Sequence, residues 1–192
     1  MKEEINQPRG PWFTNTREIL HSNKYGLRLI RDEVKRPNGS EGIYDYLKLR
    51  GNGGAYVLPL DDNGNIFLVR QFRYPANKWT MEAASGGMEE GQDFIDLASA
   101  ELKQELGIRA NIWDTLMERT DPAPHIIDSP QRLYLARDLS FYETEHEDTE
   151  QNHLSIKRIK LEDALEMVKR SEITETPTCL TIALAYNFLR NL

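Results

Sequence analysis

A glycine-rich turn followed by an amphipathic helix, residues 85–108 (SGGMEEGQDFIDLASAELKQELGI), constrains the fold of this chain more than any other stretch. Four apolar residues recur at every fourth position: Phe94, Ala98, Leu102 and Leu106. This spacing places them on one side of a helix, which we expect over residues 93–106. Gly107 follows directly, and glycine is the usual residue where a helix ends in a left-handed turn. The sequence therefore predicts a turn, a helix and a stop as one unit that packs on a core.

Two apolar runs ahead of this unit predict a β-hairpin. Residues 55–60 and 65–72 are rich in branched and aromatic side chains, and the turn-forming sequence Asp62-Asn63-Gly64 separates them. We therefore expect these two strands to pair with each other.

Strands and helices of mixed order fill the rest of the chain. Five further stretches have the composition of strands: residues 24–36, 43–51, 110–120, 132–139 and 153–161. Two C-terminal stretches, residues 161–172 and 178–192, have helical apolar spacing. This order predicts the α/β (α+β) class, with mixed sheets and helices packed on them. We expect a small strand-rich N-terminal element over residues 1–50 and one main domain over residues 51–192.

Composition excludes several classes of protein. The chain has 192 residues, of which 39% are hydrophobic, and this is enough for one well-cored domain with a small appendage. Its net charge of -7 argues against a nucleic-acid partner, which would need a basic surface. The single cysteine, Cys179, excludes an internal disulfide. No apolar run reaches the roughly 18 residues of a membrane span, and the N-terminal residues lack a signal-peptide pattern, so we expect a cytoplasmic protein without a membrane partner.

Two acidic residues of the predicted helix form a candidate metal site. Glu101 and Glu105 are four residues apart, so their side chains project from the same face, with Gln104 beside them. Two carboxylates can share a cation, and hard oxygen ligands suit Mg²⁺ or Mn²⁺, which screen a diphosphate and activate a water for attack on phosphorus. Gly86 and Gly87 let the preceding backbone turn sharply and aim a carbonyl at the same place. The same glutamates also fit an ordinary solvated helix face, so their spacing alone leaves both interpretations open.

The wider spacing resembles the Nudix box, in which a glycine, five residues, a glutamate and seven residues precede R-E-U-x-E-E-x-G-U, with U apolar. Six of the nine defined positions match: Gly86, Glu101, Leu102, Glu105, Gly107 and Ile108. Gln92 and Gln104 replace glutamates, and Ala100 replaces the arginine. The resemblance implies the α/β/α sandwich of the Nudix hydrolases, with mixed sheets.

The segments around the box resemble those of ADP-ribose pyrophosphatases, which hydrolyse nucleoside diphosphate sugars and related diphosphates. This resemblance extends from about residue 43 to the C-terminus. It implies a set of substrate-binding residues, namely Arg73, Glu82 and Gly86. It also implies a set of groups around Mg²⁺ or Mn²⁺, namely Glu101, Gln104, Glu105 and the backbone carbonyl of Ser85.

The same resemblance implies further features of the site and of the assembly. It implies two catalytic glutamates, Glu105 and Glu150. Glu150, on a late acidic segment, would act as a general base. Asn152 stands where another metal-binding glutamate is usual. The ligand would be a small nucleoside diphosphate derivative. The protein would be a homodimer in which the N-terminal strands complete the partner's site.

Several of these residues also have a purely structural interpretation. Arg73 fits either a bidentate phosphate clamp or a surface pair with an acid, and Glu82 fits a charge at the end of a strand. Glu150 belongs to a run of acids, which is usually a solvated loop. His125 and His153 have no partner at metal-ligand spacing, so we interpret them as structural. Four aromatic residues fit either base stacking or a core and are not assigned: Trp12, Phe13, Trp79 and Trp113.

Two hypotheses follow from the departures from the box pattern. In the first, the chain is a Mg²⁺-dependent hydrolase of ADP-ribose or another nucleoside diphosphate sugar, and it releases a nucleoside monophosphate and a sugar phosphate. In the second, the fold binds a nucleotide with weak or no catalysis. The amides of Gln104 and Asn152 bind a divalent cation less strongly than carboxylates, and Ala100 cannot brace the box glutamates. Retention of Glu101 and Glu105 favours the enzyme.

Overall fold

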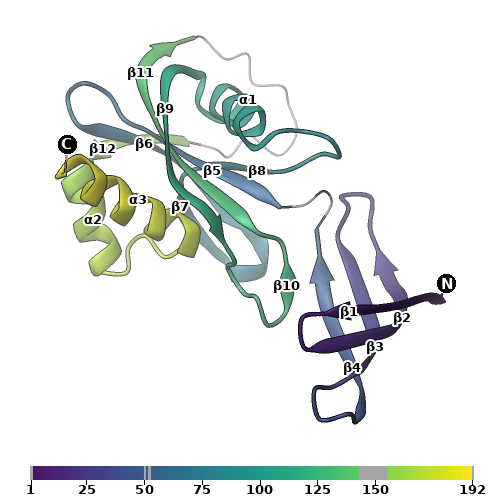
Figure 1. Ribbon diagram of the computed structural model, residues 1–192. Helices are drawn as coiled ribbons and strands as arrows, with labels where there is room; N and C mark the ends of the chain where they lie inside the picture. The colour runs from purple at the N-terminus through teal and green to yellow at the C-terminus, as the bar shows by residue number, and fades with distance from the viewer. Residues whose placement is uncertain (1, 50, 52, 143–154, 192) are drawn as a thin grey trace.

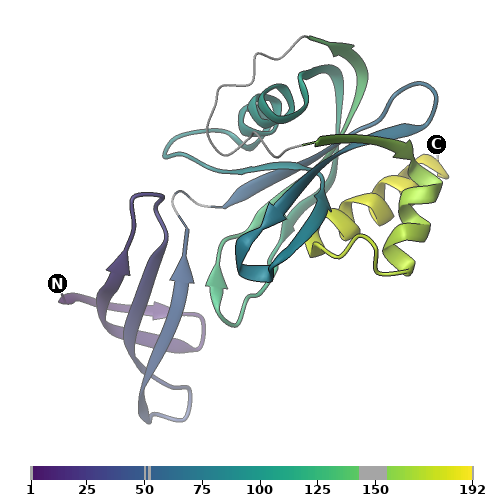
Figure 2. The same ribbon diagram turned by 180° about the vertical axis from the view of Figure 1, so that it is seen from behind.

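The computed structural model describes residues 2–49, 51, 53–142 and 155–191. Within these residues the chain forms three sheets and three α-helices (Figures 1 and 2). The mixture of sheets and helices confirms the predicted α/β (α+β) class.

An N-terminal antiparallel sheet projects from the rest of the molecule (Figure 1). Its first four strands follow one another along the chain: β1 (Lys2–Arg9), β2 (Trp12–Ser22), β3 (Arg28–Lys35) and β4 (Glu41–Lys48). Strands β3 and β4 confirm two predictions, whereas β1 and β2 were not predicted individually. Almost every residue of β1 is exposed on both faces, so its sequence carries no apolar alternation. The prolines of residues 121–130 (DPAPHIIDSP) predict a loop, but the structure forms a short strand there, β10 (Ile127–Asp128), which joins the edge of this sheet parallel to β4.

Two smaller sheets form the centre of the molecule. One has the strand order β8-β5-β11-β9 and the other has the order β12-β6-β7. Their strands are β5 (Gly54–Pro59), β6 (Asn65–Arg73), β7 (Lys78–Glu82), β8 (Ala84–Gly87), β9 (Ile108–Thr120), β11 (Gln131–Phe141) and β12 (Ser155–Lys160). The strands predicted over residues 110–120 and 132–139 are confirmed, as is the described part of the strand predicted over residues 153–161.

The predicted hairpin is wrong in its pairing, although both strands and the turn are present. Strands β5 and β6 belong to different sheets, and a single bridge between Leu60 and Ile66 joins them. The turn forms as its residues predict, because the Asp61 carboxylate accepts the N–H groups of Asn63 and Asn65. Strand β5 instead pairs with β8 and β11, and β6 pairs with β7 and β12. Strand β5 therefore pairs with strands further along the chain, whereas β6 pairs with the next strand, β7, and with the distant β12.

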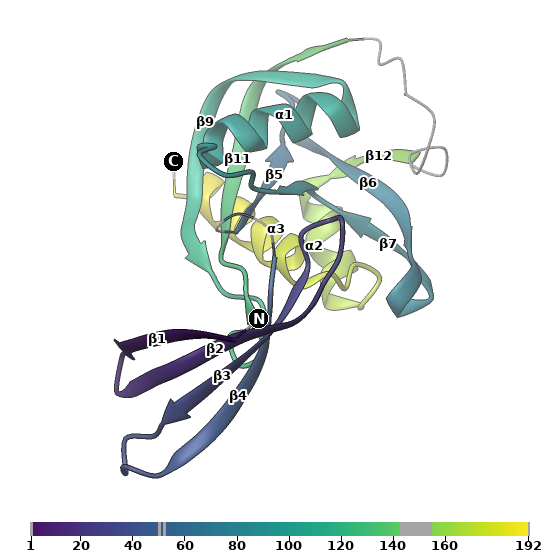
Figure 3. The ribbon, with the colours of Figure 1, turned by 90° about the vertical axis from the view of Figure 1, so that its right-hand side faces the viewer.

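The helices cover the two sides of the central sheets (Figure 3). Helix α1 (Phe94–Leu106) packs on one side, where Val57, Val69 and Leu102 belong to one buried cluster. Helices α2 (Leu161–Lys169) and α3 (Thr176–Leu189) pack on the other side, on a second cluster. Alternate residues of β5 and β6 face the two clusters, as the pleat of a strand requires. The result is the expected α/β/α arrangement.

Helix α1 matches the prediction closely. Ala98, Leu102 and Leu106 are buried, Phe94 packs against them, and Gly107 ends the helix in the left-handed conformation with a φ of 64°. No helix in the described part of the chain is long and apolar enough to cross a membrane.

Candidate functional site

The sharp turn predicted at Gly86 and Gly87 is wrong, because both residues lie in strand β8 and neither has a positive φ. This strand instead lies against a carboxylate of α1. Gly86 belongs to β8, and a Cβ atom at this position would lie 2.1 Å from Glu101 Oε1. Real Cβ atoms do not approach other atoms so closely, so the carboxylate can occupy this place only because Gly86 has no side chain. The glycine therefore lets the backbone and the acid approach each other.

Glu105, one turn further along α1, is fixed on the same strand. Its Oε2 accepts the N–H of Ser85 at 3.0 Å. Burial raises the pKa of Glu105 to about 7; this hydrogen bond opposes the rise, and the negative charge of Glu101 adds to it. Burial also raises the pKa of Glu101.

These surroundings decide between the two interpretations of the helix face. The exposed side of α1 carries Ala100, Lys103 and Gln104, whereas Glu101 and Glu105 are only partly exposed and are turned toward β8. The two glutamates therefore do not belong to an ordinary solvent-exposed helix face. Both acids are partly buried, and the charge of Glu101 raises the pKa of Glu105, so a cation between them would be favourable.

Arg73 and Glu82 contact each other. Glu82 is 1% exposed, and its Oε1 accepts Arg73 Nε at 2.9 Å. Thr80 Oγ1 and Gln71 Nε2 donate to the same carboxylate at 2.6 and 3.1 Å. Arg73 thus pairs with an acid, as its structural interpretation requires. That acid, Glu82, is itself a candidate substrate-binding residue. The positive charge of Arg73 also lowers the pKa of Glu105, which links this pair to the box glutamates.

A buried group that the sequence did not reveal lies on the opposite side of β5. The Tyr56 hydroxyl donates to Glu175 Oε1 at 3.1 Å, and Glu175 Oε2 accepts the N–H of Thr178 at 2.7 Å. Glu175 is thereby the N-cap of α3, with Pro177 in the first turn. Pro177 is a typical signal of a helix start, whereas nothing local predicts Glu175 as the cap or its contact with Tyr56.

The other predicted site residues lie in varied places. Glu150, Asn152 and His153 fall outside the described residues. Gln104 is exposed, and the side chain of Gln92 accepts the N–H of Glu89. Within the described ranges, no three His, Cys, Asp or Glu side chains are grouped so that they could hold a metal ion. A metal shell built on the two box glutamates would therefore need backbone oxygen, water or substrate oxygen as well.

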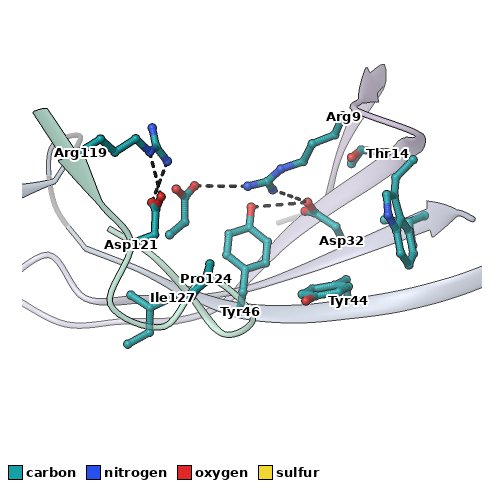
Figure 4. Close-up of a pocket in the computed structure, with 12 residues that line it drawn as sticks. Arg9, Thr14, Asp32, Tyr44, Tyr46, Arg119, Asp121, Pro124 and Ile127 are labelled. Carbon is teal, nitrogen blue, oxygen red and sulfur yellow. Dashed lines mark hydrogen bonds and ion pairs between the residues drawn. The ribbon is translucent and has the colours of Figure 1, made fainter. Parts of the chain in front are cut away.

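A cavity of about 410 Å³ lies away from these residues, between the N-terminal sheet and the segment around β10 (Figure 4). Trp12, Tyr44 and Tyr46 contribute aromatic side chains to its lining. Asp32 is 2% exposed, and both of its oxygens accept from Arg17 at 2.8 Å. Most acidic and basic side chains of this cavity pair with one another. These ion pairs lie where the N-terminal sheet meets the rest of the chain.

Comparison with known proteins agrees with this fold. A family model for the NUDIX domain matches residues 52–177, and the chain belongs to this family. It is 30% identical over 169 residues to the ADP-ribose pyrophosphatase of Bacillus subtilis (strain 168), covering 88% of this chain and 89% of that protein. It is also 30% identical over 167 residues to the ADP-ribose pyrophosphatase of Mycobacterium tuberculosis (strain ATCC 25618 / H37Rv), covering 85% of this chain and 77% of that one.

A solved structure titled "Crystal structure of ADP compounds hydrolase" has the same fold, with a TM-score of 0.76. Its sequence identity to this chain is 19%, and the match covers 91% of this chain and 92% of the other. The predicted resemblance to the Nudix and ADP-ribose pyrophosphatase group is confirmed. The family and its relatives support a pyrophosphohydrolase enzyme.

Proposed function

We propose that the protein hydrolyses the diphosphate linkage of ADP-ribose or of another nucleoside diphosphate sugar with Mg²⁺ or Mn²⁺, releasing a nucleoside monophosphate and a sugar phosphate. The observation that carries this proposal is the placement of Glu101 over Gly86 and of Glu105 against Ser85. Both glutamates keep their box positions, and both lie against strand β8. The names of the relatives point to the same class of substrate.

The residues present fit a hard divalent ion. Carboxylate oxygens of Glu101 and Glu105, together with the Ser85 carbonyl, are the type of ligand that Mg²⁺ and Mn²⁺ prefer. Mg²⁺ usually keeps several waters and takes one or two carboxylates plus phosphate oxygens, so a small protein shell is sufficient. When bound, such an ion screens the diphosphate charge and lowers the pKa of a coordinated water.

The chain's own side chains supply orientation and proton transfer. Arg73 carries a guanidinium that is held on one side by Glu82, and this pairing limits its freedom before a phosphate arrives. Glu105 accepts the N–H of Ser85, and this hydrogen bond fixes its carboxylate beside β8. Glu150 stays a prediction as the general base.

The altered box positions also fit the second hypothesis, a protein that binds a nucleotide without catalysis. Ala100 is exposed and too short to brace another residue, and Gln104 is exposed and neutral. A protein that had kept the fold and the diphosphate site but lost catalysis would show these same features, so turnover must separate the two outcomes.

Product release from ADP-ribose and a panel of nucleoside diphosphate sugars, with Mg²⁺ or Mn²⁺, tests the proposal. We expect turnover by the native chain and a loss of about 10²-fold or more for Glu105→Gln. Glu162→Gln is the matched control, since this exposed glutamate of α2 lies on the other side of the central sheets. Diphosphate that stays intact in every reaction, together with stabilisation by the same compounds, would identify a binding module instead.

The homodimer stays a prediction that rests on the resemblance. Exposed apolar side chains on the N-terminal sheet, including Ile19 at 44% and Ile43 at 57% exposed, are consistent with a surface that another chain covers. The mass of the protein in solution, measured by light scattering, tests this prediction.

A further inference from the structure

The backbone that joins β7 to β8 carries several of the candidate site groups within four residues. Glu82 ends β7, Ala83 alone joins the two strands, and Ser85 is the second residue of β8. The carboxylate of Glu82 pairs with Arg73, and the amide of Ser85 donates to Glu105. Small movements of this junction, residues 82–85, would therefore move the arginine pair and the box glutamate relative to each other.

A threonine of α3 holds this junction from the side opposite α1. The N–H of Ala83 lies between the two strands and donates to Thr178 Oγ1 at 2.9 Å. Both residues are buried, with Ala83 1% exposed and Thr178 0% exposed. Without the Thr178 hydroxyl, the buried Ala83 N–H would lose this partner. Keeping the junction in its position would then lower the stability of the folded protein.

The hydroxyl of Thr178 is itself held in place. The backbone N–H of Thr178 donates to the carboxylate of Glu175, which caps α3, and the Tyr56 hydroxyl donates to the other oxygen of that carboxylate. Tyr56 lies in β5 directly opposite Ser85 in the strand pairing. These contacts connect β5 to the first turn of α3, and the first turn of α3 to the junction. Because β5 also pairs with β8, the contacts form a closed ring.

We infer that Thr178 is a positioning residue of the diphosphate-hydrolysing site, fixed by Glu175 and Tyr56, and that it sets the junction that carries Glu82 and Ser85. The inference rests on the proposed function and adds to it a residue outside the box and outside the substrate contacts. Helix α3 thereby supports the reaction from the far side of the sheet, without contact with the reacting atoms.

Steady-state kinetics of Thr178→Val and Thr178→Ser test this role. Valine keeps the shape of threonine and removes the hydroxyl, so we expect kcat to fall about 10- to 100-fold, as small misplacements of catalytic groups do, with KM changed less than about threefold. Serine keeps the hydroxyl, so its kcat should stay within about threefold of the native value. Equal kcat for the valine and native proteins would overturn the inference, as would a serine variant as impaired as the valine variant.

Thr181→Val is the matched control for loss of stability. Thr181 is also fully buried in α3, but its hydroxyl donates to the Pro177 carbonyl within the same helix. We expect this variant to lose stability without losing kcat. A fall in kcat equal to that of Thr178→Val would assign the effect to the helix as a whole and would reject a specific role for Thr178.

Two further measurements keep the inference testable whatever the activity. If Thr178→Val does not fold, Tyr56→Phe removes only the hydroxyl that steadies Glu175, and its kcat should fall by about threefold or more. If the native protein shows no turnover, the proposed function fails, and Mn²⁺ titration decides the inference separately. We then expect Thr178→Val to bind Mn²⁺ about tenfold more weakly than Thr181→Val, because the groups near Ser85 have moved; equal affinities would reject it.

Discussion

At the scale of single residues, two adjacent glycines have opposite surroundings. A Cβ at Gly86 would collide with the Glu101 carboxylate, whereas a Cβ at Gly87 would meet no atom within 4 Å. We expect Gly86→Ala to displace Glu101 and to lower turnover of the diphosphate substrate by about 10²-fold. Gly87→Ala, which adds the same methyl group one residue away, should leave turnover nearly unchanged. Kinetics of the two variants side by side check the prediction, and equal behaviour would contradict it.

Glu105 predicts a pH dependence of stability in the metal-free protein. Burial raises its pKa from 4.5 to about 7 in the folded state, so the folded protein holds this proton more tightly than the unfolded chain does. The resulting stabilisation is complete below pH 4.5 and is lost as the pH rises through 7, with a slope of at most about 1.4 kcal/mol per pH unit. Thermal unfolding in EDTA should show that Glu105→Gln lacks this loss. Parallel curves for the native protein and the variant would show that Glu105 does not titrate in this range.

The identities of the candidate residues were readable from the sequence, but their partners were not. Box spacing places Glu101 and Glu105 on one face because a helix has a fixed period. The pairing of Arg73 with Glu82 depends instead on two strands that meet across a turn. Tyr56 and Glu175 are 119 residues apart, and no local pattern links them.

At the scale of elements, strand β3 takes part in two contrasting ion pairs. Asp32 is 2% exposed and accepts both hydrogen bonds from Arg17, whereas the Arg31–Asp45 pair between β3 and β4 is 41% exposed on both sides. We expect Asp32→Asn to lower the free energy of unfolding by about 3 kcal/mol, because it leaves a charged arginine without its buried partner. Asp45→Asn should lower it by less than about 1 kcal/mol, since exposed pairs contribute little. Urea unfolding of both variants measures the difference, and similar losses would contradict this assignment.

Local signals predicted elements better than they predicted strand pairing. The turn at residues 61–65 and the end of α1 at Gly107 follow from side-chain chemistry within a few residues. The pairing of β5 with β8 and β11 depends on strands that follow much later in the chain, and a tight turn does not oblige its two flanking strands to pair. The polar sequence of β1 gave no signal, since neither of its faces is buried.

At the scale of the whole molecule, metal binding should appear as added stability. A ligand that binds only the folded state at 100 times its Kd adds about 2.7 kcal/mol, which for a chain of this size raises Tm by about 5 to 10 °C. We expect Mn²⁺ to produce such a rise in the native protein and in Glu162→Gln. A variant with both Glu101→Gln and Glu105→Gln should lose it. A rise that persists in the double variant would place the metal elsewhere.

The N-terminal sheet has a consequence for synthesis on the ribosome. Its edge strand β10 pairs Ile127 with Leu47, so the sheet gains its last strand only after about eighty further residues have been made. Until that strand emerges, the edge of β4 has free backbone groups that another chain can occupy. The order of translation therefore leaves a period in which a strand of another chain can pair with the free edge of β4, and the rate of elongation through residues 50–128 sets the duration of that period.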